Sequence, residues 1–346
     1  MIELIEVKTA ESLDAFCAAS KDLSRDAIAS HKADAHWIAI DKGGVKARCS
    51  LWWTDTPAMA GQPTGLIGHY AASCDESARK LLQKARRELA RHGCSIAFGP
   101  IDGSTWRRYR LVTERGAEAR FFLEPDNPQD WPAHFEQSGF AQIAGYSSAL
   151  NEDLSRRDPQ SDCIEARLLN MGVVIRPMRT AQFTQELSRI HSVAAVSFRK
   201  SFLYTPIDEK DFIAQYEPVR PHIKSELCLI AEIDGRTVGF LFALPDAMQQ
   251  ARGQQIDTII IKTLAVLPEF ANEGLGSLLA DRCQKIAAES GYRRAIHALM
   301  SDSNNSRRIS NRYARVFRRY ALFGCPLSIV LCKQPTTDKG RIYEHH

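Results

Sequence analysis

The most informative part of the sequence is LAVLPEFANEGLGSLLADRCQKIAAESG, residues 264–291. An apolar strand ends at a proline, a short loop leads to Gly274-Leu-Gly276, and a long amphipathic helix follows. Glycines in such a turn let the backbone approach a ligand, and the first turn of a helix offers unpaired N–H groups that attract anions. The stretch therefore predicts a phosphate or pyrophosphate site. The dinucleotide motif GxGxxG and the phosphate-binding loop GxxxxGK[ST] are both absent, which excludes those two kinds of site.

Outward from this stretch, the hydrophobic pattern predicts two passes through a similar order of elements. In the first pass we expect a strand at 2–9, a helix at 12–28, two strands within 36–55, helices at 77–93 and 131–140, and strands at 94–102 and 141–150. In the second we expect a strand at 172–179, helices up to 216, a hairpin at 227–246, strands at 257–268 and 292–300, a helix at 277–291, a closing helix at 309–324 and a last strand at 325–333. The sequence thus predicts an α/β protein with a weak internal repeat, or two unrelated domains if the likeness is accidental.

Length and composition support this organisation. The chain has 346 residues, of which 44% are apolar and 25% charged, so two domains are expected. We place the first at residues 1–150, a polar linker at 151–170, and the second at 171–346. No apolar run approaches the roughly 18 residues of a membrane span, and no secretory leader opens the chain, so a cytoplasmic protein without membrane contact is expected.

Net charge and cysteine content limit the kinds of partner and metal site that the chain can be expected to have. The chain carries 45 Lys and Arg against 41 Asp and Glu, a net charge of +4 that is too small to predict a nucleic-acid-binding protein. Arginines gather near residues 307–319, either as a solvated helix face or as contacts to an anionic ligand. Nine cysteines never form a CxxC pair, so we expect reduced thiols and no metal site.

Residues 266–276 resemble the GNAT superfamily of acyl-CoA-dependent acyltransferases. That family has a strand ending V-x-P, an aromatic residue, then [R/Q]-x-x-G-x-[G/A] and a helix. Val266-Leu-Pro268, Phe270 and Gly274-x-Gly276 match, whereas Ala271 stands where the family has arginine or glutamine.

The resemblance implies a mixed-sheet α/β fold built from two tandem GNAT-like domains. It further implies acetyl-CoA as co-substrate, with its pyrophosphate on the amides of the loop and first helical turn and its pantetheine arm along the end of the strand. The cofactor-binding residues it implies are Leu264, Ala265, Val266, Asn272, Glu273, Gly274, Leu275, Gly276, Ser277 and, for the asparagine that the family carries in the closing helix, Asn305.

Three side chains are candidates for proton transfer. In the family a tyrosine four residues before a glycine near the end of the last helix protonates the leaving thiolate, and Tyr320 and Gly324 have that spacing. Glu232 in the hairpin is one candidate general base, and His297 in the strand expected at 292–300 is another. The alternatives are an aromatic core residue, a solvent-facing glutamate and a core histidine, and Tyr313 on the same expected helix could replace Tyr320.

The first half repeats the architecture without this chemistry. Between its strand and helix, HYAASCDESARKLL (residues 69–82) has no glycine, and Asp75 and Glu76 would repel a pyrophosphate. Phe135 stands at the position that matches Tyr320. We therefore expect a degenerate, non-catalytic domain that either has a structural role or forms one wall of the acceptor pocket. The segment 99–110, rich in arginine and aromatic residues, either contacts an anionic or aromatic acceptor or packs on the linker.

The predicted function is transfer of an acetyl group from acetyl-CoA to an amine of a small molecule or peptide, by direct attack. Two alternatives remain: an acyltransferase that uses aminoacyl-tRNA, and an acyl-CoA-binding sensor or scaffold without catalysis. The sequence identifies neither the amine nor the oligomeric state.

Overall fold

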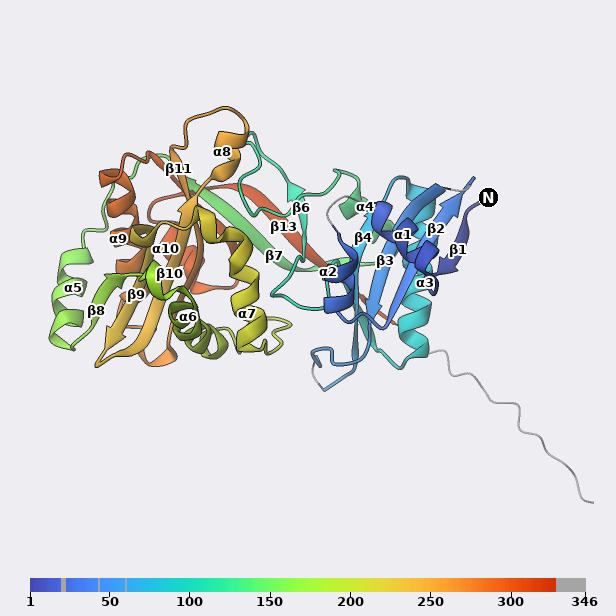
Figure 1. Cartoon of the computed structure of the whole chain (residues 1–346), viewed down its shortest axis with the longest axis horizontal. Coiled ribbons are helices and arrows are strands. Elements are labelled where there is room, and N and C mark those ends of the chain that lie inside the picture. The colour runs from blue at the N-terminus through green and yellow to red at the C-terminus, as the bar shows by residue number, and fades with distance from the viewer. Residues whose placement is uncertain (20–22, 43, 60, 328–346) are drawn as a thin grey trace, which may run out of the picture.

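The computed structural model describes residues 1–19, 23–42, 44–59 and 61–327. The protein has a mixed α/β fold, as predicted, in which the described strands join into one sheet of 13 strands. Along the sheet the order is β1-β2-β3-β4-β5-β13-β7-β12-β11-β10-β9-β8, with β6 paired to β13 (Figure 1).

The first half contains the elements expected from its hydrophobic pattern, together with the strands β4 and β6, for which no range was predicted. Its strands are β1 (Glu3–Glu6), β2 (Ala35–Asp41), β3 (Gly44–Trp52), β4 (Thr64–Ala72), β5 (Ile96–Gly99), β6 (Leu111–Glu114) and β7 (Ala141–Asn151). Its helices are α1 (Ala10–Ala18), α2 (Arg25–Ser30), α3 (Asp75–Arg91) and α4 (Trp131–Gln137). The single helix expected at 12–28 is therefore two helices within the described residues.

The second half follows the same order. Its helices are α5 (Ser161–Asn170), α6 (Phe183–Ser197), α7 (Glu209–Tyr216), α8 (Ala247–Ala251), α9 (Leu275–Glu289) and α10 (Asn305–Ser310). Its strands are β8 (Val174–Pro177), β9 (Cys228–Ile233), β10 (Arg236–Pro245), β11 (Thr258–Val266), β12 (Arg294–Ser301) and β13 (Arg315–Pro326). The expected linker thus contains α5, which contacts α9.

The closing helix predicted at 309–324 is wrong. The helix α10 ends at Ser310, and β13 runs from Arg315 to Pro326. Residues 320–325 are all buried, because β13 lies inside the sheet between β7 and β5. A continuous apolar run of this length fits a buried strand as well as a buried helix, so periodicity alone could not separate them. The last strand expected at 325–333 lies mostly outside the described residues.

The two halves exchange their last strands. β7 of the first half lies between β12 and β13, and the C-terminal part of β13 pairs with β5 of the first half. Each half therefore completes its sheet with a strand that follows the other half's helices, and the long β7–β13 pair crosses the middle of the molecule (Figure 1). A domain boundary at residue 150 stays a prediction, and the sheet itself continues from one half into the other.

The two largest hydrophobic clusters of the described residues lie one in each half. The first packs α3 and α4 against β2–β5, and the second packs α6, α7 and α9 against β9–β11. The matching glycines Gly93 and Gly291 lie two residues after the ends of α3 and α9, with φ angles of +80° and +90° that favour glycine. In the described part of the chain, no helix has both the length and the apolar character needed to cross a membrane.

Candidate functional site

Strands β11 and β12 separate in the middle of the second half. They pair in parallel only from Thr258↔Arg294 to Ile261↔His297, whereas β10 stays paired to β11 as far as Val266. The β10–β11 register shifts between Phe242 and Ala243, which leaves Lys262 as an extra residue in a β-bulge. From Lys262 onward the other edge of β11 has no neighbouring strand among the described residues.

The helix α9 begins where this open edge ends. Gly274 is its N-cap with φ +76°, a left-handed conformation that favours glycine, and no side chain caps the first turn. A Cβ on Gly276 would lie 3.3 Å from the Cδ1 atom of Ile309 and 3.8 Å from side-chain atoms of Leu264 and Val266. The first turn therefore presents bare amides beside the end of β11, an arrangement that suits a bound anion.

Both features open into one cleft of about 2960 Å³ that both halves line. On the second-half side it is lined by the end of β11, the start of α9, the end of β12 and α10. On the first-half side it is lined by residues 102–110 and 123–129 among others. The first half thus forms a wall of the cleft, next to the separated strands.

Most of the predicted cofactor-binding residues come together here. The residues of this set that line the cleft are Leu264, Ala265, Val266, Asn272, Gly274, Gly276, Ser277 and Asn305. Leu275 contributes its amide to the first turn while its side chain is buried in the core. The carboxylate of Glu273 lies 3.7 Å from Arg167, whose guanidinium also donates to the Glu273 carbonyl at 2.7 Å.

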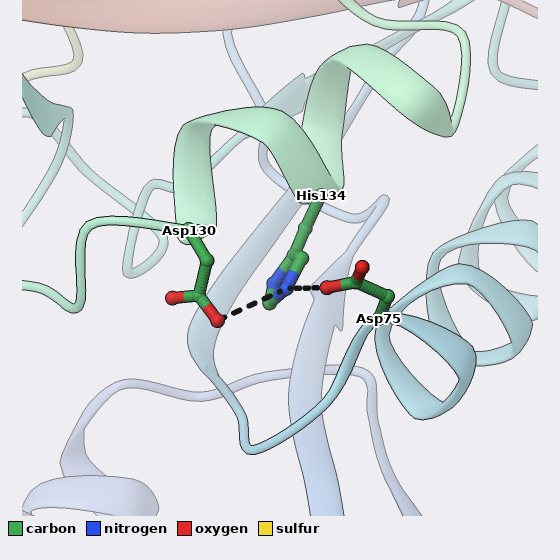
Figure 2. A group of neighbouring side chains, drawn as sticks. All are labelled: Asp75, Asp130 and His134. Atoms are coloured by element: carbon green, nitrogen blue, oxygen red, sulfur yellow. Dashed lines mark hydrogen bonds and ion pairs between the residues drawn. The ribbon is translucent and has the colours of Figure 1, made fainter.

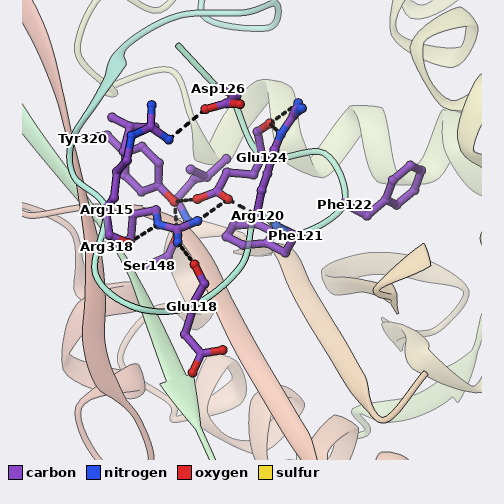
Figure 3. Close-up of polar contacts among 12 residues, drawn as sticks. Arg115, Glu118, Arg120, Phe121, Phe122, Glu124, Asp126, Ser148, Arg318 and Tyr320 are labelled. Atoms are coloured by element: carbon purple, nitrogen blue, oxygen red, sulfur yellow. Dashed lines mark hydrogen bonds and ion pairs between the residues drawn. The ribbon is translucent and has the colours of Figure 1, made fainter. Parts of the chain in front are cut away.

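Tyr320 lies on β13 rather than at the end of a helix, so its expected position is wrong. Its hydroxyl donates to Glu124 and lies 3.0 Å from the Ser148 Oγ (Figure 3). Only 1% of the residue is exposed, and burial together with Glu124 raises the pKa of its phenol well above the ordinary value. Tyr320 is not among the residues that line the cleft. Tyr313 is also buried, and its hydroxyl donates to Asp281 at 3.3 Å.

Glu232 belongs to an ion-pair network away from the cleft. Its carboxylate accepts from Arg176 at 2.7 and 2.9 Å and from Arg189 at 3.2 Å. Both arginines also bind the buried Glu186. The geometry therefore gives Glu232 a structural role between β8, β9 and α6.

His297 does line the cleft, at the point where β11 and β12 separate. Its Nε2 atom lies 3.2 Å from the Oε1 atom of Gln284, which also accepts from Asn151. Burial lowers the pKa of His297 to about 4. The imidazole is therefore neutral at pH 7, and its assigned tautomer donates from Nε2 to Gln284.

In the first half, carboxylates occupy the position of the glycine cradle. Asp75 opens α3, and its carboxylate lies 3.1 Å from His134 Nε2, while Asp130 at the start of α4 lies 3.5 Å from the same nitrogen (Figure 2). The other nitrogen of His134 lies 2.9 Å from the Tyr70 hydroxyl. Such groups can ligate a cation, but both carboxylates are exposed and sit at helix N-termini, which favour anions, so we assign no metal here. The sequence did not indicate this cluster.

In the first half, the corresponding gap between two parallel strands is filled by the chain itself. β4 and β5 pair in parallel for only three residues, from Thr64↔Ile96 to Leu66↔Phe98, and then diverge. The Ile101 amide donates to the Ile67 carbonyl and Asp102 accepts from the His69 amide, at 2.8 and 2.6 Å. A Cβ on Gly68 would lie 2.2 Å from the Ile101 oxygen, so the chain itself fills the gap.

The segment 99–110 packs on the second half rather than on the expected linker. Trp106 donates to the Thr205 carbonyl at 2.8 Å, and its ring contacts Phe198, Tyr204 and Phe212. Arg110 donates to the Leu299 carbonyl at 3.1 Å. The sequence analysis singled out this segment but did not connect it with Lys262. It did not identify Lys262 as a site residue, although a single lysine stands out in the apolar run TIIIKTLAV.

Comparisons with known proteins agree with the fold. Residues 189–310, from α6 to the end of α10, match the acetyltransferase (GNAT) family. The match identifies a GNAT domain within the second half of the chain. A search of curated proteins finds no significant match.

Solved structures share the whole architecture at low sequence identity. A tandem GNAT protein from the clavulanic acid biosynthesis pathway has a TM-score of 0.50 at 13% identity, covering 95% of this chain and 99% of that one. A GCN5-related N-acetyltransferase from Anabaena variabilis has a TM-score of 0.54 at 8% identity, covering 95% of this chain and 74% of that one. The glucosamine N-acetyltransferase region of a fungal multi-domain β-N-acetylglucosaminidase has a TM-score of 0.54 at 13% identity. The alignment covers 94% of this chain but only 38% of that longer protein. These likenesses show the tandem fold.

Proposed function

We propose that the second half transfers an acetyl group from acetyl-CoA to an amine, and that the first half is non-catalytic and walls the acceptor cleft. One observation carries the proposal: the uncapped, glycine-containing start of α9 and the open edge of β11 meet in a single cleft. Bound acetyl-CoA supplies a thioester that an amine can attack directly. The carboxylates at the matching helix start in the first half argue against a second cofactor site there.

The residues of this chain fit such a co-substrate. The amides of residues 272 and 274–277 would hold the pyrophosphate, since no side chain caps them and no Cβ at Gly276 blocks the approach, whereas the Glu273 amide already donates to the Phe270 carbonyl at 3.2 Å. The open edge at Leu264–Val266 would hold the pantetheine arm by backbone hydrogen bonds, although the Val266 carbonyl already accepts from Ser197 at 3.0 Å. Arg308 is exposed at the cleft beside this cradle and adds positive charge there.

Amides at the end of the β11–β12 pairing would polarise the reacting carbonyl. Hydrogen-bond donors fixed in advance toward developing charge commonly lower the barrier of acyl transfer more than any other group, and losing one costs roughly 3–4 kcal/mol of barrier. Here they would come from the β-bulge at Lys262, where the strand has no partner among the described residues.

Of the three proton-transfer candidates, only His297 is retained, because Tyr320 and Glu232 are bound elsewhere. A base with a pKa near 4 is weak at pH 7, since efficient proton transfer needs a pKa near the working pH. We therefore expect His297→Gln to slow turnover by only about tenfold or less. A larger loss would show that the bound state raises its pKa.

The test is calorimetric titration with acetyl-CoA, followed by a thiol-release assay with a panel of amines. Wild type should bind acetyl-CoA, whereas Gly276→Leu should not bind it, because the larger side chain fills the space between Ile309 and the end of β11. Gly44→Leu is the matched control, since its Cβ meets only one backbone atom at 3.8 Å and lies in the first half.

Three results would decide between the alternatives. Binding with thiol release supports the proposal. Binding without release for every amine makes the protein an acyl-CoA sensor. No binding, or equal binding by Gly276→Leu, overturns the proposed site.

A further inference from the structure

One cation in the cleft has no counter-charge of its own. Lys262 sits in the β-bulge where β11 leaves β12, half-buried and lining the cleft. No hydrogen bond or ion pair joins its ammonium to another residue in the described part of the chain. Its burial lowers the pKa of Lys262 to about 8, with the positive charge of Arg110 acting in the same direction.

Arg110 is fixed in place next to it. Its guanidinium lies between the rings of Tyr109 and Tyr146, at 3.8 and 4.0 Å from their centroids, and donates to the Leu299 carbonyl. Only 6% of the residue is exposed. Stacking on two aromatic rings holds a guanidinium without neutralising it. A second buried positive charge therefore faces the same space as Lys262.

The nearest carboxylate is already in use. One oxygen of Glu124 accepts from Tyr320, and the other accepts from Arg318 at 2.5 Å and from the Phe121 amide at 3.3 Å (Figure 3). Glu124 thus pairs with Arg318, and although its charge also raises the pKa of Lys262, this one carboxylate cannot balance the three cations Arg318, Lys262 and Arg110.

The lining of the whole cleft carries more positive than negative side chains. Its lining includes 12 Lys and Arg against 7 Asp and Glu. The remaining 33 Lys and Arg of the chain face 34 Asp and Glu, so the net positive charge of the protein is concentrated in the cleft. Like charges held close together away from bulk water cost free energy unless an anion pairs with them.

We propose that the acceptor amine carries a carboxylate, as an amino acid does, and that Lys262 and Arg110 bind this group. The inference rests on the proposed function, because it names the acceptor of the same site. Both cations lie where β11 and β12 separate, so a carboxylate bound there stays close to the amine that must reach the thioester. The aromatic rings of Tyr109 and Tyr146 add an apolar wall beside it.

The test compares matched amines with and without the carboxylate: L-phenylalanine with phenethylamine, and glycine with methylamine. Wild type should show kcat/KM at least about 100-fold higher for the amino acid of each pair, since charge-assisted hydrogen bonds to two cations are lost with the carboxylate. Lys262→Met should raise KM for the amino acids about 10- to 100-fold more than it raises KM for the plain amines. Lys262→Arg should restore part of the preference.

Lys200→Met is the matched control. Lys200 also lines the cleft but is exposed, away from the bulge, so its loss removes the same charge without removing this contact. A second readout does not depend on turnover: Lys262→Met should raise the thermal midpoint of the unliganded protein, and L-phenylalanine should raise that of wild type more than that of the variant.

The outcomes separate this inference from the proposed function. If plain amines react as well as amino acids, the acceptor inference is overturned while the acetyltransferase proposal stands. If acetyl-CoA does not bind, the proposed function fails, and the thermal shift with L-phenylalanine still decides whether Lys262 and Arg110 form a carboxylate site. Equal shifts for wild type and Lys262→Met would refute that site.

Discussion

Replacing Glu124 by glutamine should destabilise the protein strongly. Glu124 lies in residues 115–127, here called the strap, which runs from the first half across the second (Figure 3). Its side chain is 1% exposed and that of Arg318 is 5% exposed. Removing one partner of a buried ion pair leaves the other charge unpaired, which costs about 3–5 kcal/mol.

The expected loss of unfolding free energy comes mainly from leaving the buried Arg318 without a partner, and less from losing its attraction to Glu124. Burial raises the pKa of Glu124 above its ordinary range even though Arg318 and Tyr320 act in the opposite direction. The desolvation of the carboxylate therefore exceeds its stabilisation by the arginine. A double variant, Glu124→Gln with Arg318→Met, should accordingly recover part of the lost stability, because no buried charge is then left alone.

Urea unfolding followed by circular dichroism measures the effect. Glu114→Gln is the matched control, since Glu114 pairs with the neighbouring Arg319 at 3.3 Å, with side chains 71% and 41% exposed. That exposed pair should contribute at most about 1 kcal/mol. Equal losses for Glu124→Gln and Glu114→Gln would refute the reasoning, as would a double variant less stable than Glu124→Gln alone.

Buried groups and the contact between the halves lead to three further predictions. His297 has its pKa lowered from 6.5 to about 4 in the folded protein, so it favours folding above pH 6.5 and loses roughly 3 kcal/mol of that contribution as pH falls to 4. His297→Gln should flatten the urea-unfolding stability profile across this window, and an unchanged profile would contradict the assignment. Trp106→Ala should raise KM for the acceptor and lower stability by about 2–3 kcal/mol, while the calorimetric affinity for acetyl-CoA stays the same; a loss of that affinity would show that the wall also shapes the cofactor site. Gly68→Ala should destabilise the first half by at least about 2 kcal/mol, because its Cβ would lie 2.2 Å from the backbone oxygen of Ile101, and a wild-type unfolding midpoint would show that the gap there is not closed.

The sequence predicted those features that neighbouring residues determine together. Alternation and helical spacing predicted most strands and helices, and Asp234–Gly235 indicated the hairpin that β9 and β10 form. The glycine cradle was predicted from spacing alone, because the N-cap conformation of Gly274 and the bare first turn of α9 depend on adjacent residues. The resemblance to the GNAT family began with this stretch and extended over most of residues 171–333.

Features made by residues far apart in the chain could not be predicted in this way. Tyr320 was placed on a helix because its apolar run fits either element, and only its position between β7 and β5 makes β13 a strand. Glu232 carried no sign of the arginines that bind it from β8 and α6.

The sequence by itself therefore determined the α/β class and the uncapped glycine turn before α9, since both depend on interactions within a few residues. Tertiary structure alone decided the exchange of β7 and β13, the strap over the second half and the approach of Arg110 to Lys262. These pairings depend on which distant segments meet when apolar surface is buried, and burial is non-directional, so no local pattern encodes the partner.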